Sequence, residues 1–88
     1  MSFEQRKEEV NGTTYTFQFP GVRAANEIAD RAKNEHGVLM QTKLQEELWK
    51  HVVVDPKVNF DYFDENPKDY PKVLEVAQEV FNGPFAGK

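Results

Sequence analysis

The chain has 88 residues, a formal net charge of -4 and a sequence pI of about 5.1, so we expect one small acidic domain. It has no cysteine, which excludes disulfides and thiolate zinc sites and fits a cytoplasmic protein. Its 11 lysines and arginines are scattered among 15 acids, and an acidic surface without a basic patch repels nucleic acid. The charged N-terminal residues and the lack of a long apolar run argue against a signal peptide and a membrane span.

The first predicted elements are two strands joined by a tight turn. Asn11-Gly12 favours a type I′ hairpin turn, because both residues tolerate a positive φ. Residues 13–19 then alternate, which predicts a half-buried strand with the inward side chains Tyr15, Phe17 and Phe19. The charged segment from Phe3 to Val10 is interpreted as an edge strand, because charge at an edge discourages aggregation.

Two helices are predicted next. The first runs from Val22 to about Glu35, with Gly37 as its C-terminal stop, and the second from about Leu39 to His51. Residues 52–54 are interpreted as extended chain, or as a helix end that enters a short strand. The apolar stripes that indicate the helices are Val22, Ala25, Ile28, Ala29 and Ala32 in the first and Met40, Leu44 and Leu48 in the second.

The C-terminal third begins with a segment rich in aromatic and acidic side chains. Residues 59–67 are interpreted as a loop, in which Asn66-Pro67 starts a single helical turn. A last helix begins near Asp69 or Tyr70, with proline tolerated in its first turn, and ends at Asn82-Gly83-Pro84.

This order of elements predicts the α+β class, with an N-terminal β-hairpin followed by about three helices and a mostly helical content. Residues 1–83 are predicted to form the single small domain. Residues 84–88 are predicted to form a flexible C-terminal tail.

The residue types that carry catalysis or bind metals do not form a recognisable constellation. His36 and His51 lie near predicted helix ends, where the helix dipole alone explains them. The only serine is Ser2, and without cysteine or a placed serine there is no nucleophilic triad. The acidic cluster lacks EF-hand spacing and is better explained by caps and turns: Asp55, Asp61, Asp64, Glu65 and Asp69. We expect no catalytic, metal or cofactor site and no small-molecule substrate.

Aromatic side chains offer the remaining candidates for contact with a partner. Phe60 and Phe63 are interpreted as a lid over the core, and an exposed anchor patch that includes Tyr62 is the alternative. Trp49 flanks the stripe of its helix and is the best single candidate for a contact residue. We therefore expect the protein to work through protein–protein interaction.

Four segments together resemble the small tail assembly chaperones of long-tailed phages and prophages of Gram-positive bacteria. They are residues 17–26 (FQFPGVRAAN), 48–58 (LWKHVVVDPKV), 60–63 (FDYF) and 80–83 (VFNG), and the resemblance spans about residues 13–83. It implies a cytoplasmic assembly factor that is absent from the finished virion. Such a factor coats the tape measure protein, keeps it soluble and helps recruit tail tube protein subunits. The resemblance also implies self-association in some members and a frameshifted longer form in many.

A chaperone for an aggregation-prone helix needs an apolar stripe in a charged surround. For this role we predict a partner-binding surface of Met40, Leu44, Leu48 and Trp49, and the alternative is that the same stripe is core. Two other functions stay open: a structural tail-completion or connector protein that remains in the virion, and a small regulatory protein of a mobile element. The acidic charge argues against the regulatory protein if it binds DNA.

Overall fold

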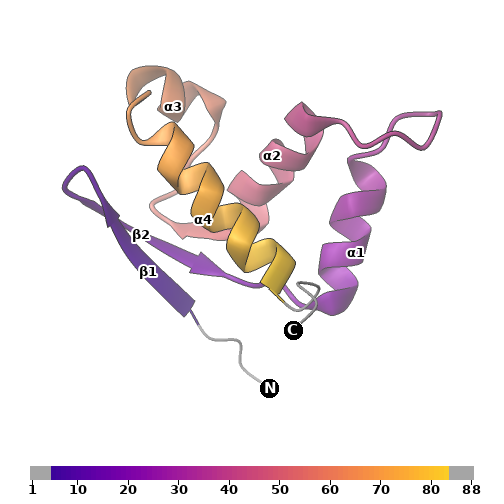
Figure 1. Ribbon diagram of the computed structural model, residues 1–88, viewed down its shortest axis with the longest axis horizontal. Coiled ribbons are helices and arrows are strands. Elements are labelled where there is room, and N and C mark those ends of the chain that lie inside the picture. The colour runs from indigo at the N-terminus through magenta and orange to yellow at the C-terminus, as the bar shows by residue number, and fades with distance from the viewer. Residues whose placement is uncertain (1–4, 84–88) are drawn as a thin grey trace.

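The computed structural model describes residues 5–83 and confirms the α+β class. The predicted tail, residues 84–88, and the first residues of the predicted edge strand lie outside this range. Figure 1 shows a β-hairpin on one side of the molecule and the helices stacked beside it.

The sheet has three antiparallel strands in the order β1-β2-β3 within the described part of the chain. β1 (Gln5–Val10) and β2 (Thr13–Gln18) form the predicted hairpin, in which Val10 pairs with Thr13. At its turn Asn11 has φ 51° and Gly12 has φ 89°, the left-handed backbone that the sequence predicts there. β3 (Val53–Asp55) pairs with β2, and Val52 caps the preceding helix, so the alternative of a helix end that enters a short strand is confirmed with the strand one residue later than predicted.

Four helices are present in the described residues: α1 (Val22–Arg31), α2 (Gln41–His51), α3 (Phe60–Glu65) and α4 (Tyr70–Asn82). α4 packs on β1 and β2, α2 packs on β3 and α4, and α1 packs on α2 (Figure 1). The first turn of α4 contains Pro71, as predicted, where a missing N–H costs no helical hydrogen bond.

The core lies where the sheet, α1, α2 and α4 meet. Tyr15 and Phe17 are fully buried, as the alternation of their strand predicts, and Phe19 packs against the core from its edge. The stripe of α4 is equally buried, with Val73, Val76 and Ala77 at 0% exposure. The sequence pattern therefore identifies the centre of the core correctly.

The boundary between the first two helices differs from the prediction. α1 ends at Arg31 instead of about Glu35, and α2 begins at Gln41 instead of about Leu39. The Asn34 side chain explains the difference, because its Oδ1 accepts hydrogen bonds from the backbone N–H groups of His36 and Val38. Asparagine that bonds to nearby backbone in this way competes with helix formation. Gly37 (φ 77°) therefore belongs to a turn instead of following a helix.

The aromatic and acidic segment also differs from the prediction, because residues 60–65 form α3 instead of a loop. Asn59 caps this helix, since its Oδ1 accepts a hydrogen bond from the Tyr62 backbone N–H at 2.8 Å. The Asp69 N–H donates to the Asn66 carbonyl at 3.1 Å, which places a turn where a single helical turn was predicted.

Candidate partner-binding surface

Three of the four residues predicted to bind a partner belong to the core. Leu48 is 0% exposed, Trp49 3% and Leu44 8%, whereas Met40 is 39% exposed. The Trp49 ring packs against Phe63 with a centroid separation of 4.8 Å. In this fold a partner could reach only Met40 without opening the core. The alternative prediction, that the stripe is core, is therefore correct for Leu44, Leu48 and Trp49.

Trp49 is buried by a cluster of aromatic rings from α3 and the start of α4. Phe60 meets its edge at 6.0 Å and Tyr70 at 6.3 Å, in the edge-to-face arrangement that aromatic pairs favour. Phe63 is 4% exposed and Phe60 is partly buried against the core, which agrees with the interpretation of both as a lid. The Trp49 Nε1 has no hydrogen-bond partner among residues 5–83.

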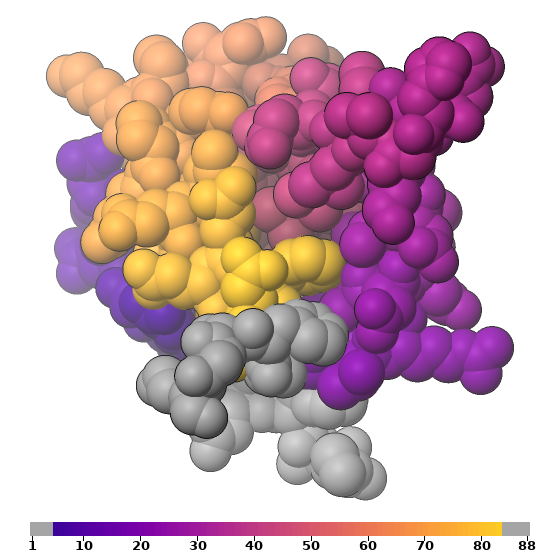
Figure 2. Space-filling model, turned by 45° about the vertical axis from the view of Figure 1, so that its right-hand side comes forward, coloured from indigo at the N-terminus to yellow at the C-terminus, as the bar shows by residue number. Residues whose placement is uncertain are grey.

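Met40 belongs to a loop between α1 and α2 that stands out from the body of the protein. We call residues 32–40 the projecting loop; it forms the corner at the upper right of Figure 2. The Asn34 N–H donates to the Val38 carbonyl at 2.8 Å, and the Met40 N–H donates to the Ala32 carbonyl at 2.7 Å. These bonds flank an antiparallel bridge between Lys33 and Leu39, so the loop is a small hairpin with a defined conformation.

The projecting loop exposes three consecutive apolar side chains: Val38 at 57%, Leu39 at 41% and Met40 at 39%. Successive side chains of extended backbone point to opposite faces. Val38 and Met40 therefore share one face, which we call the Met40 face. Leu39 lies on the other with Lys33, its partner across the bridge, and we call this the Leu39 face. The sequence predicted Met40 as a contact residue but missed Val38 and Leu39, because the second helix was predicted to begin at about Leu39.

An apolar hollow of about 290 Å³ lies between α3 and α4, and we call it the α3–α4 hollow. Its lining is aromatic and apolar apart from one carboxylate: Phe60, Phe63, Asp64, Pro67 and Tyr70. A second open hollow of about 300 Å³ lies between α2 and α3 and contains Trp49 with the charged residues Glu46, Lys50 and Asp61.

A buried polar network ties the hairpin to the last two helices. The Tyr15 hydroxyl donates to Asp69 Oδ2 at 2.5 Å and lies 2.7 Å from the Tyr62 hydroxyl, while Asn11 Nδ2 donates to Asp69 Oδ1 at 2.9 Å. Burial, reinforced by the hydrogen bond to Asp69, raises the pKa of Tyr15 well above its ordinary value. The phenol therefore stays protonated and serves as a structural donor.

The two histidines lie in different settings. His51 is the last residue of α2, as predicted, and its Nε2 lies 3.3 Å from Glu47 Oε1. His36 is in the projecting loop and not in a last helical turn, because α1 ends before it. Arg31 donates to Glu47 at 2.6 Å, and this hydrogen bond lowers the pKa of the Glu47 carboxyl.

Within residues 5–83, no group of three or more histidines and acids is placed to hold a metal ion. No helix in that range is long and apolar enough to cross a membrane. Comparison of the chain with protein-family models, curated proteins and solved structures gives no match. The resemblance to tail assembly chaperones therefore stays a prediction.

Proposed function

We propose that this protein is a non-enzymatic phage tail assembly chaperone that works in the cytoplasm of the bacterial host. In this role it binds the tape measure protein, keeps it soluble and helps recruit tail tube subunits. The observation that supports an interaction role is the projecting loop, where three apolar side chains are exposed to solvent. Leu44 and Leu48, which share a predicted stripe with Met40, are buried in the core. The resemblance of residues 13–83 supplies the partner class.

The Met40 face suits a helical client for two physical reasons. A helix offers its apolar side chains in an i, i+3, i+4 stripe, and a pair of neighbouring apolar side chains can contact one step of that stripe. Methionine is flexible and polarisable, so Met40 can adapt to many client side chains. Lys33 and Lys43 form no ion pair among the described residues, which leaves charge free around the loop to keep the complex soluble.

Co-expression with the long helical protein encoded beside this chain tests the proposal. We expect the tagged protein to raise the soluble fraction of that client and to co-purify with it. The double variant Val38→Thr/Met40→Gln should lose this effect while it stays folded, because both side chains are exposed. Val22→Gln is the matched control, since Val22 is a similarly exposed valine outside the loop. A client that stays insoluble and unbound beside well-folded wild type would overturn the proposal.

Substitutions at the buried residues of the predicted partner-binding surface cannot serve in this test. Truncating a buried tryptophan costs ~3–5 kcal/mol, and a domain of this size has a total stability of only ~5–15 kcal/mol. Trp49→Ala would therefore reduce client solubility by unfolding the chaperone, whatever Trp49 contacts. The loop variants avoid this ambiguity.

A further inference from the structure

We propose that Asn11 is a modification site whose deamidation is blocked in the folded chain by contacts with the start of α4. When the hairpin separates from α4, Asn11 converts to aspartate or isoaspartate, and the product prevents the same contacts from forming again. This inference does not depend on the proposed function. It rests on the Asn11-Gly12 dipeptide of the hairpin turn and on the hydrogen bonds of the Asn11 side chain.

The reaction needs only water and the chain itself. The backbone nitrogen of Gly12 loses its proton to a base in solution and attacks Cγ of Asn11, so that a C–N bond forms while the bond from Cγ to Nδ2 breaks. Nδ2 takes up a proton and leaves as ammonia, and the product is a cyclic succinimide. Water then opens this ring at either carbonyl and gives aspartate or isoaspartate. Glycine favours the attack, because it has no side chain and its backbone is permissive.

The folded chain holds both reacting groups in place. Asn11 Nδ2 donates to Asp69 Oδ1 at 2.9 Å and to the Lys68 carbonyl at 3.3 Å, so both hydrogens of the amide have acceptors just before α4. Figure 1 shows the hairpin turn on the side of the molecule where α4 begins. The Gly12 peptide is fixed as well, because the turn is closed by the last pair of the β1–β2 ladder. The attack requires these two groups to move together, and the hydrogen bonds oppose that movement.

The acceptor beside α4 is itself held in place. Asp69 is 7% exposed, and its second oxygen accepts a hydrogen bond from the Tyr15 hydroxyl at 2.5 Å. Tyr15 is fully buried, so the core fixes the carboxylate to which Asn11 is bound. Release of the Asn11 side chain therefore requires the hairpin turn to come away from α4.

The product cannot restore these contacts. Deamidation replaces the NH2 donor of Asn11 by a carboxylate oxygen, so an acceptor would face the Asp69 carboxylate and the Lys68 carbonyl. Two carboxylates that share a site repel each other, and the change adds a negative charge to a chain whose net charge is already -4. Isoaspartate also lengthens the backbone inside a tight turn. The modified turn is thereby kept away from α4.

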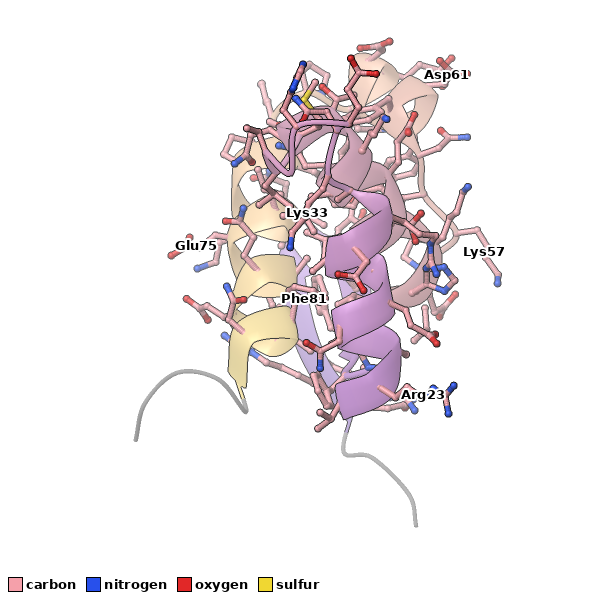
Figure 3. The ribbon with its side chains drawn as sticks, turned by 90° about the vertical axis from the view of Figure 1, so that its right-hand side faces the viewer. Arg23, Lys33, Lys57, Asp61, Glu75 and Phe81 are labelled. Atoms are coloured by element: carbon pink, nitrogen blue, oxygen red, sulfur yellow. The ribbon has the colours of Figure 1, made fainter. Side chains whose placement is uncertain are left out.

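The same dipeptide occurs once more in the sequence, as Asn82-Gly83, and gives an internal reference. Asn82 is the last residue of α4 and is exposed, and its side chain forms no hydrogen bond within residues 5–83. Figure 3 shows the preceding residue, Phe81, on the side of α4 that faces α1. The two sites share the reacting residue types and differ in what holds the asparagine side chain.

Peptide mapping by mass spectrometry measures conversion at both sites in one sample of the full chain. In folded wild type at mildly alkaline pH, Asn11 should convert at least about tenfold more slowly than Asn82, since its two hydrogen bonds must open first. In urea the two sites should convert at similar rates. The inference is overturned if Asn11 converts as fast in the folded chain as in urea, or if Asn82 is protected as strongly as Asn11.

Two further variants test the anchor and the product. Asp69→Ala, checked for folding by circular dichroism, should raise the rate at Asn11 about tenfold and leave Asn82 unchanged; an unchanged rate at Asn11 in the folded variant overturns the inference. Asn11→Asp carries the product from the start and should lower the urea midpoint. Asn82→Asp adds the same charge at the end of α4 and should lower it less. This comparison does not require Asp69→Ala to fold, and equal midpoints would show that the product leaves the contact with α4 intact.

Discussion

The Tyr15 hydroxyl connects three parts of the fold through two hydrogen bonds. It lies between Asp69 at the start of α4 and Tyr62 of α3 and is itself carried by β2. We expect Tyr15→Phe to lower the free energy of unfolding by ~1–3 kcal/mol, because Asp69 loses a donor while it stays buried. Urea denaturation measures the loss. Tyr70→Phe, which removes a partly buried bond to Gln45, should cost only ~0.5–1.5 kcal/mol, and equal losses would contradict the special role of Tyr15.

The same hydroxyl makes stability depend on alkaline pH. Because burial raises the pKa of Tyr15 in the folded chain, the unfolded chain releases this proton first, from about pH 10 upward. The contribution of Tyr15 is complete below that pH and is lost as pH rises toward the folded pKa, with a slope of up to ~1.4 kcal/mol per pH unit. Urea midpoints above pH 10 should fall more steeply for wild type than for Tyr15→Phe. Parallel slopes would show that Tyr15 ionises equally in both states.

The sequence could not predict which residues of the proposed contact surface are buried. Met40, Leu44 and Leu48 follow one helical stripe, and a stripe looks the same whether it faces a core or a partner. The outcome depends on α3 and Tyr70, whose rings cover Trp49 from a distant part of the sequence. Only Met40 stays exposed, because α2 begins at the next residue.

At the scale of elements, α3 is a six-residue helix that depends on its cap. So short a helix has little stability of its own, and Asn59 satisfies one of its free N–H groups. We expect Asn59→Ala to lower the free energy of unfolding by ~1 kcal/mol, as cap losses do. Asn59→Asp is the matched control, since a carboxylate caps as well as an amide and suits the helix dipole. If thermal melts of both variants coincide, the cap is not what stabilises α3.

The hairpin and α4 were predicted correctly, whereas α3 and the end of α1 were not. The hairpin follows from Asn11-Gly12 and strict alternation, and α4 follows from a stripe that recurs over its 13 residues. α3 spans fewer than two turns, so periodicity could not indicate it, although Asn59 stands three residues before the N–H that it caps. α1 ends early because the Asn34 side chain accepts hydrogen bonds from two backbone N–H groups. The helical pattern of the sequence continues past this point and gives no sign of these bonds.

At the scale of the whole molecule, the size of the domain decides where it can bind. In a chain of 88 residues the helices that carry apolar stripes are needed for the core, and their buried side chains cannot be presented to a partner without unfolding. The projecting loop has its own backbone hydrogen bonds and exposes Val38, Leu39 and Met40, while Ala32 at its start is buried. Substitutions of the three exposed side chains should keep the free energy of unfolding within ~0.5 kcal/mol of wild type.

The proposed function predicts a loss that is confined to one face of that loop. If the protein solubilises the tape measure protein as proposed, Val38→Thr/Met40→Gln should abolish this effect and Leu39→Gln should leave it unchanged, because Leu39 lies on the opposite face. Co-expression of each variant with the tape measure protein, scored by the soluble fraction of that protein, measures the difference. If Leu39→Gln loses the effect as well, both faces of the loop contribute to the contact, and the assignment of binding to the Met40 face is wrong.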